Sequence, residues 1–258
     1  MESKSSADSL NLIDISKTYI TGRVFPFLKQ SQKIKALDSV SLTLKPGFYG
    51  LLGPNGSGKS TLMNIIVGLL RQDTGLVLWN KQSVFSLGVE YRRILGYMPQ
   101  QQTLYDNYTG RRFLNYIAAL KEIPAKEVWD EVTSAARAVN LLDNLDFRIS
   151  AYSGGMKQRL LAAAAMMHMP RLLIMDEPMA GLDPKERVHL RNTLAEKSKT
   201  CIVIIATHIV SDVENVADEI LILKKGRLCE KDTPGNLIEK YSPGESLESV
   251  YLSVFGTE

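Results

Sequence analysis

The sequence contains no long hydrophobic run. Nowhere do its 258 residues include about 18 or more consecutive apolar residues, the length that a transmembrane helix needs. The longest apolar runs, residues 160–167 and 202–206, have the length of core elements in a globular protein. The opening residues Met-Glu-Ser-Lys-Ser-Ser are polar, so we expect neither a secretory signal nor a membrane span.

Cysteine and excess charge are also scarce. The two cysteines, Cys201 and Cys229, are too few for a disulfide framework and form no C-x-x-C pair, which favours a reducing compartment. Lysine and arginine total 31 against 28 aspartates and glutamates, and this balance gives no reason to expect nucleic-acid binding. With 45% hydrophobic and 23% charged residues, the composition excludes collagen and disordered chains and is typical of a globular protein.

The order of apolar patterns indicates an α/β chain with a helical insert in its middle third. Four short strand-like runs come first, at residues 11–15, 40–44, 48–52 and 75–79. Helical periodicity follows, with one face made by Phe113, Ile117 and Leu120, a second by Val128, Val132, Ala135, Val139 and Leu142, and a third helix from Ser153 to Met167. The strand signal returns at residues 172–175 and 202–206, separated by a helix at 184–197, and more weakly at 219–223.

A glycine-rich segment between a strand-like run and a helix-like run carries the sharpest chemical signal. Gly53-Pro54-Asn55-Gly56-Ser57-Gly58-Lys59-Ser60 fits the pattern G-x-x-x-x-G-K-[ST]. Glycines let backbone N–H groups approach phosphate oxygens, and the following helix N-terminus favours negative charge. Lys59 would contact the β- and γ-phosphates, and the Ser60 hydroxyl would bind Mg²⁺. The alternative is a glycine-rich turn with a surface lysine.

A pair of carboxylates ends the apolar run at residues 172–175. Asp176 is placed to hold Mg²⁺ beside a phosphate loop, usually through water. Glu177, one residue further, points elsewhere, and we expect it to act as the general base on a water that attacks the γ-phosphate. The alternative is a strand end capped by solvated acids.

The segment from Tyr152 to Leu160, Y-S-G-G-M-K-Q-R-L, resembles the signature motif of ATP-binding cassette (ABC) ATPases, with Tyr152 in place of the usual leucine. The resemblance implies an α/β P-loop NTPase fold, with a RecA-like core, an antiparallel β subdomain and an inserted α-helical subdomain. It also implies one ABC domain over residues 1–258, with the core at about 10–99 and 168–235, the helical subdomain at about 100–167 and a C-terminal tail at 236–258.

The same resemblance implies further site residues. Gln100 is similar to the Q-loop glutamine that senses Mg²⁺, although Gln101 and Gln102 leave its register open. Asp183 is similar to the D-loop aspartate, or serves as a helix N-cap before Pro184. His208 resembles the switch histidine at the γ-phosphate, and Tyr19 the aromatic residue that stacks on adenine.

The residues expected to contact ATP within one chain are Tyr19, Gly53, Pro54, Asn55, Gly56, Ser57, Gly58, Lys59, Ser60, Thr61 and Gln100. Mg²⁺ would be bound by Ser60, Gln100 and Asp176, partly through water. The resemblance assigns Ser153, Gly154, Gly155 and Met156 to the ATP of a second copy. Two copies would thus pack head to tail around two ATP molecules, as a homodimer or a heterodimer.

Together with this resemblance, the absence of a membrane span implies that ATP binding and membrane crossing belong to separate polypeptides. An ABC ATPase of this kind resembles the separate ATP-binding subunit of a transporter, peripheral at the cytoplasmic face of the membrane through a separate transmembrane permease subunit. The sequence Met156-Lys157-Gln158 resembles exporters of drugs, antibiotics, lipids or polysaccharides more than importers. The alternatives are a soluble ABC ATPase that acts on DNA or the ribosome, and a non-enzymatic module gated by ATP.

The segment from Thr21 to Lys35 is longer than expected between the first two strands. It combines four cations with the apolar run Val24-Phe25-Pro26-Phe27-Leu28. One hypothesis is contact with the membrane partner or with anionic lipid head groups. A longer solvated hairpin is the simpler interpretation, because the cations do not form a dense basic cluster.

Overall fold

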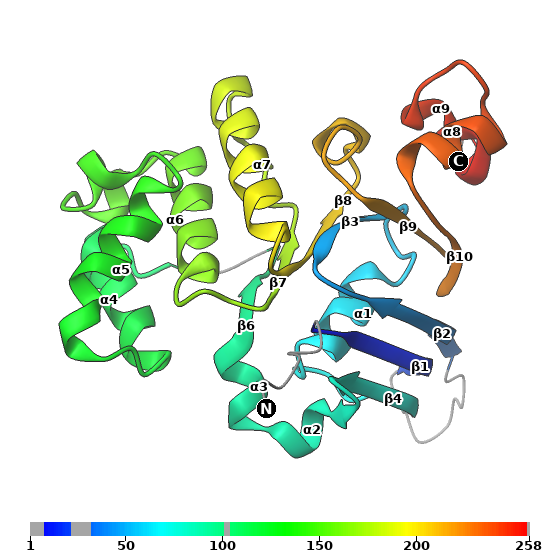
Figure 1. Ribbon diagram of the computed structural model, residues 1–258, viewed down its shortest axis with the longest axis horizontal. Helices are drawn as coiled ribbons and strands as arrows, with labels where there is room; N and C mark the ends of the chain where they lie inside the picture. The colour runs from blue at the N-terminus through cyan, green and yellow to red at the C-terminus, as the bar shows by residue number, and fades with distance from the viewer. Residues whose placement is uncertain (1–7, 22–31, 101–103, 257–258) are drawn as a thin grey trace, which may run out of the picture.

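The computed structural model describes residues 8–21, 32–100 and 104–256. Its centre is a six-stranded sheet in the order β10-β9-β3-β8-β7-β6 (Figure 1). The strands that pair in parallel are β3 (Gly47–Leu52), β6 (Leu95–Met98), β7 (Leu172–Asp176), β8 (Ile202–Thr207) and β9 (Glu219–Lys224). The edge strand β10 (Arg227–Asp232) pairs antiparallel to β9. Strands that are far apart in the chain, such as β3 and β8, are neighbours in this sheet.

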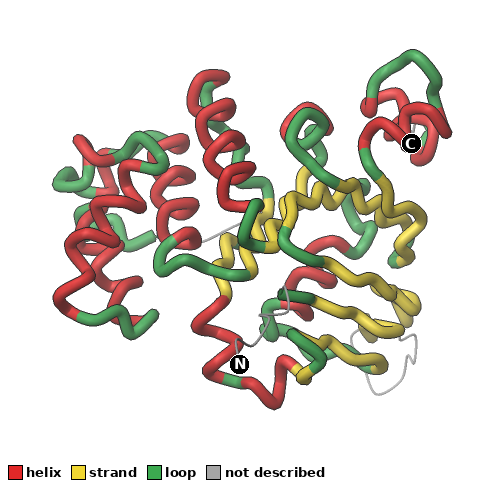
Figure 2. Tube along the Cα trace, in the orientation of Figure 1, coloured by secondary structure: helices red, strands yellow, loops and turns green. Residues whose placement is uncertain are grey.

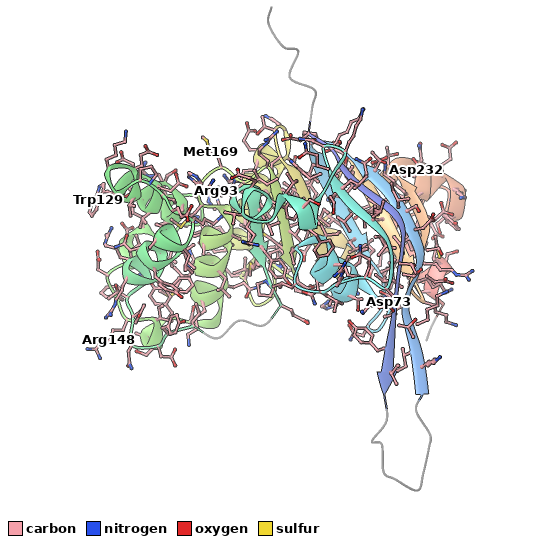
Figure 3. The ribbon with its side chains drawn as sticks, turned by 90° about the horizontal axis from the view of Figure 1, so that it is seen from below. Asp73, Arg93, Trp129, Arg148, Met169 and Asp232 are labelled. Carbon is pink, nitrogen blue, oxygen red and sulfur yellow. The ribbon has the colours of Figure 1, made fainter. Side chains whose placement is uncertain are left out.

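A second, antiparallel sheet of four strands has the order β2-β1-β4-β5. Its strands are β1 (Leu10–Thr21), β2 (Gln32–Leu44), β4 (Thr74–Trp79) and β5 (Gln82–Ser83). Figure 3 shows β1 and β2 running together out of the body of the molecule, and Thr21 pairs with Gln32 at the end of their ladder. The hairpin interpretation of the Thr21 to Lys35 segment agrees with this pairing, and residues 22–31 lie outside the described residues.

Three of the helices gather at one end of the molecule, and the others are distributed around the sheets (Figures 1 and 2). The helical insert consists of α4 (Gly110–Leu120), α5 (Ala125–Arg137) and α6 (Gly154–Met166), gathered at one end of the molecule. The remaining helices are α1 (Lys59–Ile66), α2 (Val84–Leu87), α3 (Val89–Ile94), α7 (Pro184–Ser198), α8 (Pro234–Tyr241) and α9 (Leu247–Phe255). The described residues contain no helix with the length and hydrophobicity needed to cross a bilayer.

The central sheet is buried on both faces, which explains its continuous apolar strands. Along β7, Leu173 and Met175 pack with the helical insert. Leu172 and Ile174, which alternate with them, pack with α1 and the antiparallel sheet. Because successive side chains of a strand point to opposite faces, β7 contributes alternate residues to two hydrophobic cores.

Two predictions about the helical insert were wrong. Leu120 is 62% exposed, and the buried face of α4 is formed by Phe113, Leu114 and Ala118 instead. The second helix ends at Arg137, so Val139 and Leu142 follow it rather than belonging to it. Asn140, between them, has φ of 53° and turns the chain out of the helical conformation. Val139 is nevertheless fully buried, because an apolar side chain can fill the core from a turn as well as from a helix.

Candidate active site

The predicted site residues converge at one edge of the central sheet. Parallel neighbouring strands end at the same edge, so the segments that follow β3, β8, β7 and β6 meet there. A pocket of about 480 Å³ lies at this edge. Its lining consists of Ile34, Lys35, Ala36, Asn55, Gly56, Ser57, Gly58, Lys59, Ser60, Thr61, Gln100, Asp176, Glu177 and Lys225.

The phosphate loop connects β3 to α1 as predicted. Gly58 stands at the helix N-cap with φ of 107° and ψ of 1° and provides no side-chain cap. A Cβ atom there would lie 2.5 Å from Ala36 O, so only glycine fits this position. Ser57 Oγ is buried without a hydrogen-bond partner in the described part of the chain. The helix that follows the loop thus starts without a side-chain cap, and its first N–H groups are available to an anion.

Lys59 reaches into the pocket with its charge buried. Its Nζ donates to Gly53 O at 2.5 Å and to Pro54 O at 3.1 Å, and the residue is 9% exposed. Burial lowers the pKa of Lys59, against the opposing pull of the Glu177 and Asp176 carboxylates. A cation held this way, with little competition from water, suits a polyanionic ligand.

Ser60 and Asp176 face each other across the pocket. Ser60 Oγ donates to Asp176 Oδ2 at 3.3 Å. Burial and the neighbouring Glu177 carboxylate raise the pKa of Asp176. Among the described residues, no cluster of three His, Cys, Asp or Glu side chains could hold a metal ion. Since Mg²⁺ prefers few carboxylates together with water and phosphate oxygens, this hydroxyl–carboxylate pair fits it.

Glu177 is held by donors on three sides. Its Oε2 accepts from Thr207 Oγ1 at 3.0 Å, and its Oε1 accepts from the His208 backbone N–H at 2.9 Å and lies 2.6 Å from His208 Nδ1. The backbone of Glu177 has φ of 51°, a left-handed conformation that is unusual for a residue with a Cβ. The pair Glu177 and His208, predicted separately from the sequence, is therefore in direct contact.

The other predicted ATP contacts lie at different distances from the pocket. Gln100 lines it, while Gln101 and Gln102 fall outside the described residues. Gly53 and Pro54 meet the Lys59 ammonium through their carbonyls. Tyr19 is outside the lining; its hydroxyl lies 3.4 Å from Thr61 Oγ1, and the side chain is 38% exposed. Stacking of Tyr19 on adenine remains a prediction.

The signature residues lie apart from the pocket, at the start of α6. Ser153 is the N-cap, and its side chain accepts from Met156 N. Ser153 and Gly154 are exposed, and Gly155 and Met156 are partly exposed. Asp183 caps α7 by accepting from Glu186 N at 3.0 Å, so its predicted N-cap role is confirmed. Contact of these residues with a second copy stays a prediction.

Four residues of the pocket were missed from the sequence: Ile34, Lys35, Ala36 and Lys225. Lys225 and Gly226 form the turn between β9 and β10, with φ of 49° and 77°. Gly226 N donates to Ser57 O, and Asp38 N donates to Gly226 O. The Lys-Gly pair indicates a turn, but no local pattern shows that the turn reaches a loop about 170 residues earlier.

Comparison with known proteins decides the family. The sequence profile described as "ABC transporter" matches residues 37–180. The chain belongs to the ABC transporter family. The resemblance read from the signature motif is confirmed, and the chain carries the ATP-binding ATPase cassette of that family.

Relatives of the cassette include two proteins of Bacillus subtilis. The uncharacterised ABC transporter ATP-binding protein YxlF is 35% identical over 70% of this chain and 60% of its own length. The linearmycin resistance ATP-binding protein LnrL is 33% identical over 84% of this chain and 70% of its own. A solved ATP-binding subunit of an ABC transporter aligns with a TM-score of 0.80 and 28% identity, covering 94% of this chain and 98% of that one.

The cassette is shorter than many of its relatives. The chain spans 60%, 27%, 63% and 65% of the length of four curated relatives that it matches. The matched part includes the phosphate loop and the Asp176–Glu177 pair. Activities that depend on the whole of those proteins are therefore matters for proposal.

Proposed function

We propose that this chain is the ATP-hydrolysing subunit of an ABC transporter and that it drives a separate membrane-spanning permease. The observation that carries the proposal is the meeting of Lys59, Ser60, Asp176, Glu177 and His208 at one sheet edge. A cation, a hydroxyl–carboxylate pair and a well-held acceptor are the groups that ATP hydrolysis requires.

The proposed chemistry assigns one task to each group. The phosphate loop and Lys59 bind the β- and γ-phosphates. Ser60, Asp176 and Gln100 would hold Mg²⁺, which supplies charge neutralisation on the phosphates when bound. Glu177 accepts a proton from the attacking water as the water's oxygen bonds to the γ-phosphorus and ADP leaves. The donors from Thr207 and His208 hold the Glu177 carboxyl group in position.

The second half of the proposal concerns assembly. Ser153 and the N–H groups of Gly154 and Gly155 form an exposed anion-binding helix start, and we assign it, with Met156, to the ATP of a second copy. Asp183 would lie at the same interface. ATP would then bridge two copies, identical or related, and hydrolysis would release them.

The setting follows from the assembly. We propose that the cassette lies at the cytoplasmic face of a membrane and is attached to it through the permease. The helical insert of about residues 100–167 would form the contact with the permease. Export is the proposed direction, since Met156-Lys157-Gln158 resembles exporter signatures and one relative is named for linearmycin resistance. Contact of the Thr21 to Lys35 segment with the partner or with lipid stays a hypothesis.

ATPase activity, ATP affinity and co-purification of the full chain test this proposal. Steady ATP hydrolysis is expected, and Lys59→Ala should weaken ATP affinity by about 100-fold, because a buried charged contact to phosphate is lost. Lys126→Ala, at an exposed lysine of α5, serves as the control. The chain should also co-purify with a multi-span membrane protein whose addition in vesicles stimulates ATPase activity. Stimulation by DNA or ribosomes instead would favour the alternative function, and absence of hydrolysis would contradict the proposal.

A further inference from the structure

We propose that Gln158 is a positioning residue that ties the signature helix α6 to the Glu177 backbone, so that the two ATP sites of a dimer influence each other through one protomer. This inference rests on the proposed function. It concerns a residue in the second turn of α6 that lines no part of the ATP pocket.

The tie is a direct hydrogen bond between distant parts of the chain. Gln158 Nε2 donates to the Glu177 carbonyl oxygen at 2.7 Å. The same carbonyl accepts from Ala180 N at 3.2 Å, and Glu177 N donates to Ala206 O at 2.8 Å. The Glu177 backbone is therefore fixed by α6, by its own loop and by β8.

The conformation of Glu177 explains why such a tie matters. Its φ of 51° is unfavourable for a residue with a side chain, and conformations of this kind persist only where the surroundings hold them. The side chain of Glu177 is oriented from this backbone toward Thr207 and His208. Loss of the Gln158 donor would leave the Glu177 carbonyl with the longer hydrogen bond from Ala180 N, so the backbone that directs the carboxylate would be held less firmly.

The helix makes the tie a connection between sites. Gln158 follows the N-cap Ser153 by five residues, which is about 7.5 Å along a helix. In the first turn, Gly155 lies so close to the next loop that a Cβ atom would be 3.2 Å from Gly181 O. A helix is stiff over this length, so displacement of its start by a partner's phosphate moves the Gln158 amide with it. The start of α6 faces the partner's ATP, whereas Glu177 acts on the chain's own ATP.

The test compares two glutamine variants with matched chemistry. Gln158→Met keeps the length of the side chain and removes the donor. Gln72→Met is the control, because Gln72 Nε2 also donates to a backbone carbonyl, Gly75 O at 3.1 Å, away from the pocket. Both residues are partly buried. The measurements are ATPase kinetics, affinity for a fluorescent ATP analogue and thermal unfolding of the full chain.

For Gln158→Met we expect kcat to fall about 10- to 100-fold, because misplacing a reacting group by about 1 Å can cost about 100-fold. The KM for ATP should stay within about 2-fold. The Hill coefficient for ATP should fall toward one. Gln72→Met should keep the wild-type kcat. An unchanged kcat and Hill coefficient in Gln158→Met would overturn the role of Gln158. No hydrolysis by the unaltered chain would overturn the proposed function and this inference together.

A second variant separates positioning from general loss of structure. In Gln158→Glu the carboxyl group can donate to the Glu177 carbonyl only when protonated. The ratio of its kcat to the wild-type kcat should therefore rise several-fold as the pH falls from about 8 to about 6, since the protonated fraction of a carboxyl grows about 10-fold per unit above its pKa. A ratio that stays constant with pH would contradict the hydrogen bond as the working contact.

Discussion

The two ends of the proposed ATP site differ in how far one chain completes them. At the phosphate-loop end, Lys59, Asp176 and Glu177 are 9%, 6% and 8% exposed and already contact neighbouring groups. At the signature end, Ser153 and Gly154 are exposed at the open start of a helix. One chain can thus bind the charge of the nucleotide while leaving one side of it uncovered. If the proposed function is right, one copy is enough to bind ATP, whereas hydrolysis needs a second copy to cover the uncovered side.

The largest effect on ATP hydrolysis should come from substitution of Glu177, which should stop turnover without preventing ATP binding. We expect Glu177→Gln to bind ATP normally and to lose about 1,000-fold in hydrolysis, because the amide cannot accept the proton of the attacking water. The bridge between two copies would then persist, and ATP should convert the protein to a stable dimer in light scattering. Glu90→Gln, at an exposed glutamate of α3, is the control. Near-normal turnover by Glu177→Gln would remove the assignment of the base.

A smaller effect on ATP hydrolysis is expected at the signature end of the site. Ser153→Ala removes the N-cap of α6, which should lower the free energy of unfolding by about 1 kcal/mol. It should also lower ATPase turnover by about 10-fold through weaker dimerisation, since each lost tenfold corresponds to about 1.4 kcal/mol. ATP affinity measured at concentrations where the protein is monomeric should be unchanged.

Ser246→Ala provides the matched control for this comparison. Ser246 is also a serine N-cap, at the start of α9, and accepts from Ser249 N. It should show the loss of stability without the loss of turnover. If both variants lose turnover equally, the start of α6 has no role beyond capping its own helix.

The smallest effect is expected on the stability of the fold, from the buried carboxylate of Asp176 at the phosphate-loop end. The pKa of Asp176 is raised by burial and by Glu177, so this group stabilises the fold at pH values below its unfolded pKa and loses that contribution as the pH rises through the folded pKa. Without ATP and Mg²⁺, Asp176→Asn should therefore be more stable than the wild type by about 1 kcal/mol near pH 8. The difference should vanish near pH 4 in urea unfolding. Asp130→Asn, at an exposed aspartate of α5, should show no such trend.

Local patterns predicted the parts of the site that are local in the chain. The phosphate loop lies between a strand and a helix, the Asp176–Glu177 pair lies at the end of a strand and the Ser153 cap begins a helix, so each occupies only a few consecutive residues. Their residue types are dictated by φ angles, capping and charge, which a sequence displays directly. Glu177 and His208 were predicted as separate site residues, and their direct contact is known only from the structure.

The parts that escaped prediction depend on long-range contacts. β6 is only four residues long and contains Gly96, so it gives little strand signal. The exposure of Leu120 depends on which neighbours α4 packs against, which a helical period cannot specify. The contact of Gln158 with the Glu177 carbonyl joins α6 to the end of β7, and no spacing in the sequence encodes it.

The turn at Lys225-Gly226 has a consequence for the order in which the molecule can form. Gly226 N holds Ser57 O, and a Cβ atom at Gly226 would lie 2.7 Å from Ala36 O, so the phosphate loop is fitted to a segment near the end of the chain. The central strand β3 likewise pairs with β8 and β9, which are both synthesised later. During synthesis at about 5–20 residues per second, the loop would remain without this support for roughly 10–30 s after its own translation. We therefore expect the phosphate loop to reach its final conformation only after the turn at Lys225-Gly226 has been made.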